Sequence, residues 1–100
     1  MDCSGLVYTT YKKEGISMPR ISRDMATKGN RISLSITNKG DLVFFKTNKN
    51  KKTINHVGLV VENKNGKIFF IHSTSSLGVI ISSLEERYWK NTFVEVRRVI

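Results

Sequence analysis

The feature that most constrains the fold is a hairpin signal in the second half of the chain. Residues 57–61 and 67–71 are two apolar runs, and the segment Asn63-Lys64-Asn65-Gly66 lies between them. Such a segment favours a hairpin, because Asn and Gly tolerate the left-handed backbone that tight turns require. The sequence therefore predicts an antiparallel pair of strands at this place.

The rest of the chain divides into a helical first third and a strand-rich remainder. A helix is predicted over residues 3–14, ended by Gly15, and a shorter helix is predicted over residues 22–28. Residues 30–39 have the composition of a loop. Further strands are predicted over residues 42–45, 78–81 and 93–100.

A third short helix is predicted before the last strand. The sequence Ser83-Leu84-Glu85-Glu86 matches a capping box, in which a hydroxyl and a carboxylate satisfy free amides at a helix start. The helix that follows would carry Arg87, Tyr88 and Trp89. A helix-rich third followed by a run of antiparallel strands is typical of the α+β class.

Size and composition limit the domain count and the compartment. The chain has 100 residues, which suffice for one domain over residues 1–100. Its single cysteine excludes a disulfide within the chain. No apolar run reaches the roughly 18 residues of a membrane span, and the acidic, polar first residues do not read as a signal peptide. The formal net charge of +9 makes nucleic acid the first partner to consider.

Cys3 lies where the first predicted helix begins. A thiol is a nucleophile only as its thiolate, and a helix N-terminus or a nearby imidazole favours that form. The free backbone N–H groups of a first helical turn can also meet an oxyanion. A lone cysteine is more often a small buried hydrophobe, so Cys3 needs partners before it predicts catalysis.

Two histidines, His56 and His72, flank the predicted hairpin. Side chains alternate between the faces of a strand, so the length of the hairpin loop decides whether these imidazoles share a face. A three-residue loop makes them diagonal neighbours, and a five-residue loop makes them directly opposite. A tight Asn65-Gly66 turn sends them to opposite faces. Two of these three registers pair the imidazoles.

Paired imidazoles beside Cys3 would suit a cysteine hydrolase. His56 would act as general base toward the thiol and His72 would orient it. A Cys-His-His zinc site with a water as fourth ligand ranks lower, because nothing else in the sequence supplies metal-ligand spacing. We therefore expect neither a metal nor a cofactor.

Four segments, taken in order, carry a resemblance to a known family. They are Asp2-Cys3-Ser4-Gly5-Leu6-Val7, Gly40-Asp41-Leu42-Val43-Phe44-Phe45, His56-Val57-Gly58-Leu59 and Phe70-Ile71-His72-Ser73. Together they resemble the successive signatures of the NlpC-type cell-wall peptidases, which are papain-like cysteine peptidases of bacterial envelopes. The later Gly78-Val79, Tyr88-Trp89 and Arg97-Arg98-Val99 are also typical of that family.

The resemblance implies a papain-like fold in which an antiparallel sheet packs against the helix that carries Cys3. It implies a nucleophile at Cys3, a base at His56 and a third polar residue at His72. The implied reaction hydrolyses amide bonds in peptidoglycan stem peptides, commonly between D-γ-glutamate and the following diamino acid. The implied location is the cell envelope or the exterior.

Weaker implications concern substrate binding. The resemblance assigns Asp2, Ser4 and Arg20 to the substrate subsite, although helix capping explains Asp2 and Ser4 about equally well and Arg20 also fits a solvated charge. Relatives carry a segment before the Asp-Cys-Ser-Gly motif, so we expect a domain shortened at its N-terminus.

The strongest alternative is a catalytically inactive basic domain that binds cell wall or nucleic acid. Lys46, Lys49, Lys51 and Lys52 cluster in one predicted loop, and such patches attract polyanions. No aromatic platform interleaves with these lysines, as single-strand binding would need. A solvated loop explains them as well, so specific nucleic-acid binding is not expected.

Overall fold

The computed structural model describes residues 3–48, 50 and 52–99 of the chain. Its helices are α1 (Cys3–Lys13), α2 (Ser22–Met25) and α3 (Arg87–Thr92), with a short 3-10 turn, η1 (Leu34–Ile36). Its strands are β1 (Asn30–Ile32), β2 (Leu42–Phe45), β3 (His56–Lys64), β4 (Lys67–Thr74), β5 (Gly78–Ser83) and β6 (Phe93–Arg98). All strands belong to one antiparallel sheet in the order β1-β6-β2-β3-β4-β5, so the α+β prediction is confirmed.

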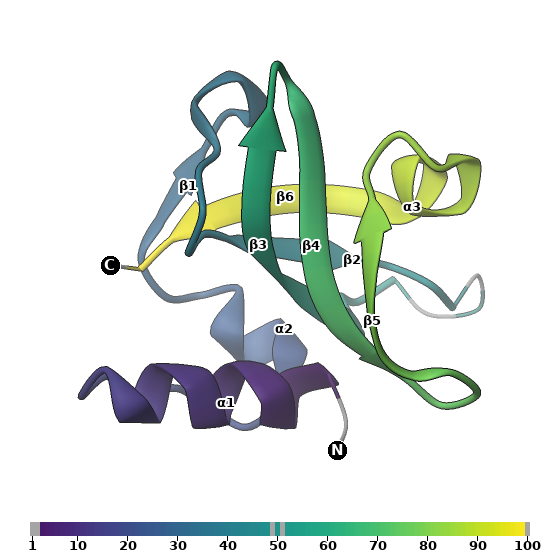
Figure 1. Cartoon of the computed structure of the whole chain (residues 1–100). Coiled ribbons are helices and arrows are strands. Elements are labelled where there is room, and N and C mark those ends of the chain that lie inside the picture. Colours follow the sequence, from purple (N-terminus) through teal and green to yellow (C-terminus); the bar gives the residue numbers. More distant parts are fainter. Residues whose placement is uncertain (1–2, 49, 51, 100) are drawn as a thin grey trace.

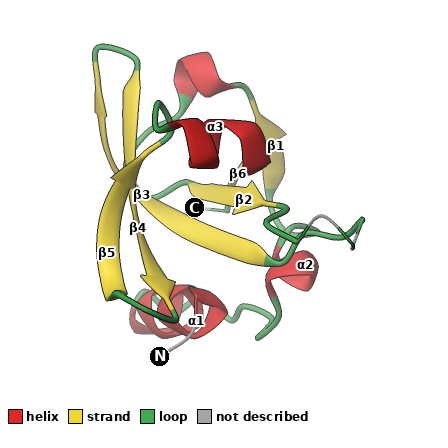
Figure 2. Cartoon of the chain, turned by 90° about the vertical axis from the view of Figure 1, so that its right-hand side faces the viewer, coloured by secondary structure: helices red, strands yellow, loops and turns green. Residues whose placement is uncertain are grey.

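The helix α1 lies across one side of the curved sheet (Figure 1). Its backbone contacts β3 and β4, the two strands that carry the histidines. Gly15 ends it with a positive φ of 77°, as the sequence predicts, because the chain reverses there and Ile16 donates to the carbonyl of Tyr11 at 2.9 Å. In both Figure 1 and Figure 2 its N-terminal end lies beside the end of β4.

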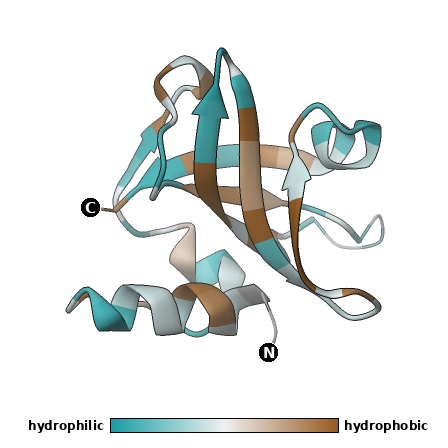
Figure 3. Cartoon of the chain, viewed as in Figure 1, coloured by the Kyte–Doolittle hydropathy of each residue, from teal (hydrophilic) through white to brown (hydrophobic). Residues whose placement is uncertain are grey.

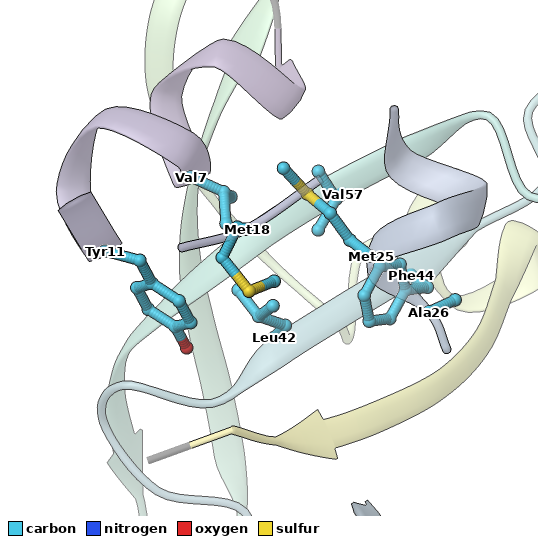
Figure 4. Close-up of a cluster of buried hydrophobic side chains, with 8 residues drawn as sticks. All are labelled: Val7, Tyr11, Met18, Met25, Ala26, Leu42, Phe44 and Val57. Atoms are coloured by element: carbon cyan, nitrogen blue, oxygen red, sulfur yellow. The ribbon is translucent and has the colours of Figure 1, made fainter. Parts of the chain in front are cut away.

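Apolar side chains fill both faces of the sheet. The face toward α1 and α2 holds one cluster, drawn in Figure 4, of Val7, Tyr11, Met18, Met25, Ala26, Leu42, Phe44 and Val57. The opposite face holds a second cluster of Val43, Phe45, Val60, Ile68, Phe70 and Val96. The four residues of β2 are fully buried because they alternate between these two clusters. Figure 3 shows the same pattern, with a hydrophobic middle of β4 and a hydrophilic tip of the β3–β4 hairpin.

An ion pair between a buried carboxylate and a half-buried guanidinium closes the start of β2 against the end of β6. The carboxylate of Asp41 accepts from Arg98 Nε at 3.0 Å and from Arg98 Nη2 at 2.9 Å, in a two-pronged arrangement. It also accepts from the backbone amide of Asn38 at 2.8 Å. Arg98 donates further to the carbonyl of Ile36 at 2.7 Å. These bonds place the ends of β2 and β6 side by side.

Two parts of the chain differ from the sequence-based predictions. Residues 30–39 are not a loop throughout, because Asn30–Ile32 pairs with the distant β6. The capping box is only half formed. The carboxylate of Glu86 accepts from the backbone amide of Ser83 at 2.6 Å. The hydroxyl of Ser83, however, accepts from the backbone amide of Glu85 rather than from that of Glu86. This box therefore closes a turn, and α3 begins after it at Arg87.

Element ends differ by a few residues. The strands β3, β4 and β5 are longer than predicted, because pairing with neighbours continues into polar residues such as His56 and Thr74. The helix α2 is shorter, and ordinary turns follow it. Ile100, the predicted end of the last strand, lies outside the described residues.

Candidate active site

The two histidines share one face of the sheet and contact each other directly. His56 Nε2 lies 2.9 Å from His72 Nδ1, within hydrogen-bonding distance. His56 is the first residue of β3 and pairs with Phe45 of β2. His72 lies near the end of β4 and is completely buried. The predicted pairing of the imidazoles is therefore present.

This pairing arises from a β-bulge rather than from a longer loop. The hairpin turn is the tight Asn65-Gly66 form, with φ of 54° and 90°, and Lys64 pairs with Lys67. By itself this register would place the histidines on opposite faces. The register shifts between Val60 and Glu62, so that one extra residue in β3 moves every earlier side chain to the other face. The bulge brings the imidazoles together.

Ser82 continues the hydrogen-bonded chain beyond His72. Its hydroxyl lies 2.8 Å from His72 Nε2, and the residue is buried on β5. His72 pairs with Ile80 and Ser82 with Phe70, so Ser82 is a diagonal neighbour of His72 on the same face. A row of His56, His72 and Ser82 therefore crosses three adjacent strands.

Aromatic rings enclose the two imidazoles. Trp89 of α3 stacks on His56, with ring centroids 5.2 Å apart and an interplanar angle of 21°. The same indole meets His72 edge to face at 4.6 Å. Phe70 lies 4.7 Å from His72, and Phe45 lies 5.8 Å from His56. The helix α3 thus serves to place an apolar cover over the histidine pair.

Burial keeps both imidazoles uncharged near neutral pH. Burial, with a smaller contribution from the neighbouring His72, lowers the pKa of His56 to about 4. Burial also lowers the pKa of His72, although the negative charge of Glu86 opposes this shift. A neutral imidazole can accept a proton, so the arrangement suits a general base.

Gly58 makes room for this packing. A Cβ atom at Gly58 would lie 2.5 Å from Cδ2 of Phe70 and 3.3 Å from Cγ2 of Val43. Any other residue would therefore push Phe70 away from His72. The glycine of the His-Val-Gly segment is explained by the space that the aromatic ring requires.

The other predicted site residues lie at α1 or close to it. Cys3 is the first residue of α1, and Ser4 is buried in the same turn. Asp2 lies outside the described residues, as do Lys49 and Lys51 of the predicted basic loop. Arg20 is exposed, and its guanidinium lies 4.8 Å from the centre of the Tyr8 ring on α1.

The zinc alternative is not favoured by the geometry. The two facing imidazole nitrogens are at hydrogen-bonding distance from one another, which leaves no room for an ion between them. Among the residues that the structure describes, no group of three or more His, Cys, Asp or Glu side chains is placed to hold a metal ion.

In the described part of the chain, no helix is long and apolar enough to cross a membrane.

Sequence reasoning did not assign roles to Ser82 and Trp89. Trp89 was placed correctly on a short helix, but its contact with His56 depends on how that helix folds back over the sheet. Ser82 is separated from His72 by ten residues and a turn. The register of β4 and β5 would have revealed it, because both residues lie on one face of that strand pair.

Comparison with known proteins decides the family. The sequence model of the NlpC/P60 family matches residues 1–98. The chain belongs to the NlpC/P60 family. This NlpC/P60 chain is 39% identical over 101 residues to the murein DD-endopeptidase MepS/murein LD-carboxypeptidase of Escherichia coli K12. It is 36% identical over 97 residues to the gamma-D-glutamyl-L-lysine dipeptidyl-peptidase of Bacillus subtilis 168.

A solved structure supports the same assignment. The fold matches an NlpC/P60 family protein from Bacillus cereus ATCC 10987 with a TM-score of 0.86 at 30% identity, over 99% of this chain and 32% of that one. The alignments cover 100% of this chain and 50% of the E. coli relative, and 97% and 32% for the B. subtilis relative. This NlpC/P60 chain therefore spans half, or less, of the length of these relatives.

Proposed function

We propose that this chain is the catalytic part of a cysteine peptidase that hydrolyses amide bonds in peptidoglycan stem peptides. The observation that carries the proposal is the hydrogen-bonded pair of His56 and His72 on strands that α1, the helix beginning at Cys3, packs against. Membership of the NlpC/P60 family, with relatives named as endopeptidases and peptidases, supports the same reaction class.

The proposed roles follow from the chemistry of the three side chains. Cys3 is the nucleophile, His56 is the general base and His72 orients His56 through the bond between their rings. Because burial holds the pKa of His56 at about 4, its ring is a neutral proton acceptor when a substrate arrives.

The reaction would proceed in two halves. The proton of the Cys3 thiol passes to His56, the sulfur attacks the amide carbonyl, and the amine leaves with that proton as a thioester forms. Water then gives a proton to His56 and attacks the thioester, which releases the acid and returns the thiol. The neutral starting state of His56 suits both halves, since the ring takes and returns one proton in each.

We propose the bond between D-γ-glutamate and the following diamino acid as the substrate. The name of the B. subtilis relative describes action on a γ-D-glutamyl-L-lysine peptide and supports this choice. The E. coli relative carries the names of two other bond types, so the assay must distinguish them. Ser4 and Arg20 would contribute to the substrate subsite, and the proposed location is the cell envelope or the exterior.

The test is digestion of defined muropeptides. Peptides containing a γ-D-Glu–diamino acid bond, a D-Ala–diamino acid cross-link or an L,D-linked terminal alanine are incubated with the chain, and fragments are identified by mass spectrometry. We expect cleavage at the γ-D-Glu bond, and loss of at least 10³-fold in rate for Cys3→Ala, since a removed nucleophile leaves only binding and oxyanion effects.

The control must address the length that the E. coli relative does not share with this chain. The same assay is run on a fusion of this chain with the unmatched part of that relative, because the chain covers 50% of that protein. Cleavage that survives Cys3→Ala would contradict the mechanism. Failure of both the chain and the fusion to cut any of the peptides would contradict the function.

A further inference from the structure

The hydroxyl of Ser82 is the last member of the row that crosses β3, β4 and β5. It lies 2.8 Å from His72 Nε2, and only 6% of Ser82 is exposed. His72 is fully buried. Its ring nitrogen Nδ1 faces His56, and its ring nitrogen Nε2 faces Ser82. The proposed function gives Ser82 no role.

A neutral imidazole has one N–H group and one lone pair. His72 therefore donates one of its two bonds and accepts the other. If Ser82 accepts from Nε2–H, the lone pair of His72 is on Nδ1 and must accept from Nε2–H of His56. That tautomer of His56 has its lone pair on Nδ1, the nitrogen that the bond to His72 does not use.

The reversed arrangement would disable the base. If Ser82 donated to Nε2, His72 would carry its proton on Nδ1 and donate to His56 Nε2. His56 would then carry its own proton on Nδ1 and would have no lone pair to offer a thiol. The direction of the bond at Ser82 therefore decides whether His56 can take a proton.

We propose that Ser82 is a positioning residue that fixes the tautomers of both histidines by accepting a hydrogen bond from His72, an inference that rests on the proposed role of His56 as base. The arrangement also fits the charged intermediate. When the proton of the Cys3 thiol moves to Nδ1 of His56, the imidazolium still donates Nε2–H to His72. No other bond in the row has to reverse.

The experiment reads the tautomers directly by ¹⁵N NMR of the imidazole rings at neutral pH, together with kcat and KM for muropeptide cleavage by the full chain. In the wild type we expect both His56 and His72 with the proton on Nε2. In Ser82→Ala we expect His72 to divide between two tautomers and kcat to fall about tenfold, the worth of one hydrogen bond, with KM little changed.

Two variants separate positioning from packing. Ser82→Thr keeps the hydroxyl and is expected to restore the wild-type tautomer and most of kcat. Ser83→Ala removes the neighbouring hydroxyl of β5, which accepts from Glu85 and not from a histidine, and is expected to change neither readout. A fall in kcat without a change of tautomer in Ser82→Ala would overturn the proposal.

The readouts also separate this inference from the proposed function. A wild-type His72 with its proton on Nδ1 overturns the inference, and this measurement stands even if Ser82→Ala does not fold. If no muropeptide is cut but the tautomers are as expected and change in Ser82→Ala, the proposed function fails while the positioning role of Ser82 is supported.

Discussion

Two polar clusters lie in this sheet, and they differ in how their buried groups avoid the cost of burial. In the Asp41–Arg98 pair, the carboxylate and the guanidinium face each other at 2.9 to 3.0 Å. The His56–His72–Ser82 row contains no opposite charge among its members and is held by bonds between neutral groups. Burial penalises a charge that lacks a partner, so the first cluster is stable when ionised and the second only when neutral.

This difference determines which of the two clusters can take part in catalysis. A carboxylate and a guanidinium in contact attract each other and hold their backbones together, which suits the joining of two strand ends. A neutral imidazole under an indole ring has a lone pair that can accept the proton of a thiol during a reaction.

The largest expected effect is loss of folding stability in acid. The pKa of His56 is about 4 in the folded chain, against 6.5 for an ordinary histidine, so the unfolded chain binds the proton more tightly. This contribution to stability is fully present above pH 6.5 and is lost as the pH falls toward 4. A shift of this size corresponds to about 3 kcal/mol of the free energy of unfolding.

Urea unfolding measured from pH 7 to pH 4 checks this prediction. The double variant His56→Gln, His72→Gln is the control, since it has no imidazole to protonate and should show a much flatter dependence across this range. If the free energy of unfolding fell equally with pH in both proteins, the pKa of His56 would not be lowered by folding, and the prediction would be contradicted.

A smaller effect is expected from breaking the charged cluster. Asp41→Ala leaves the guanidinium of Arg98 without its carboxylate and removes the acceptor of the Asn38 amide. We expect the melting temperature to fall by roughly 5–10 °C, the usual response of a domain of this size to losing a well-formed pair whose carboxylate is buried.

The matched control is an exposed pair in the same chain. Arg23 and Asp24 approach only to 4.0 Å, and their side chains are 61% and 54% exposed. Asp24→Ala should therefore change the melting temperature by no more than a degree or two, because solvated pairs contribute little. If both variants melt alike, the Asp41 pair does not hold the strand ends as described.

Local sequence signals predicted most of the fold. Gly15 marked the end of α1, the Asn65-Gly66 pair marked the hairpin, and the apolar run of β2 was found at its observed ends. The strand β1 was missed because its three residues have no apolar pattern, and it exists through pairing with the distant β6. Such pairing depends on tertiary contacts that no short window contains.

The contact between the two histidines of the candidate site was predicted, but its cause was not. The pairing of His56 with His72 was expected from two longer loop registers, whereas the tight turn and a bulge near Val61 produce it. A single extra residue in a strand has no clear signal in one sequence, since Val61 and its neighbours look alike as strand formers. Ser82 and Trp89 depend on the same geometry and were not assigned roles for that reason.

The most direct test of the central claim uses the single cysteine of the chain. The rate at which iodoacetamide alkylates Cys3 is measured from pH 5 to pH 9 in the wild type and in His56→Gln, with His72→Gln as a second variant. If His56 takes the proton of Cys3 as the sulfur reacts, the wild-type thiol should react faster at neutral pH than an ordinary thiol of pKa about 8.5, and His56→Gln should shift the profile toward that of the ordinary thiol. His72→Gln should shift it less. Superimposable profiles for the wild type and His56→Gln would contradict the claim that His56 is the base for Cys3.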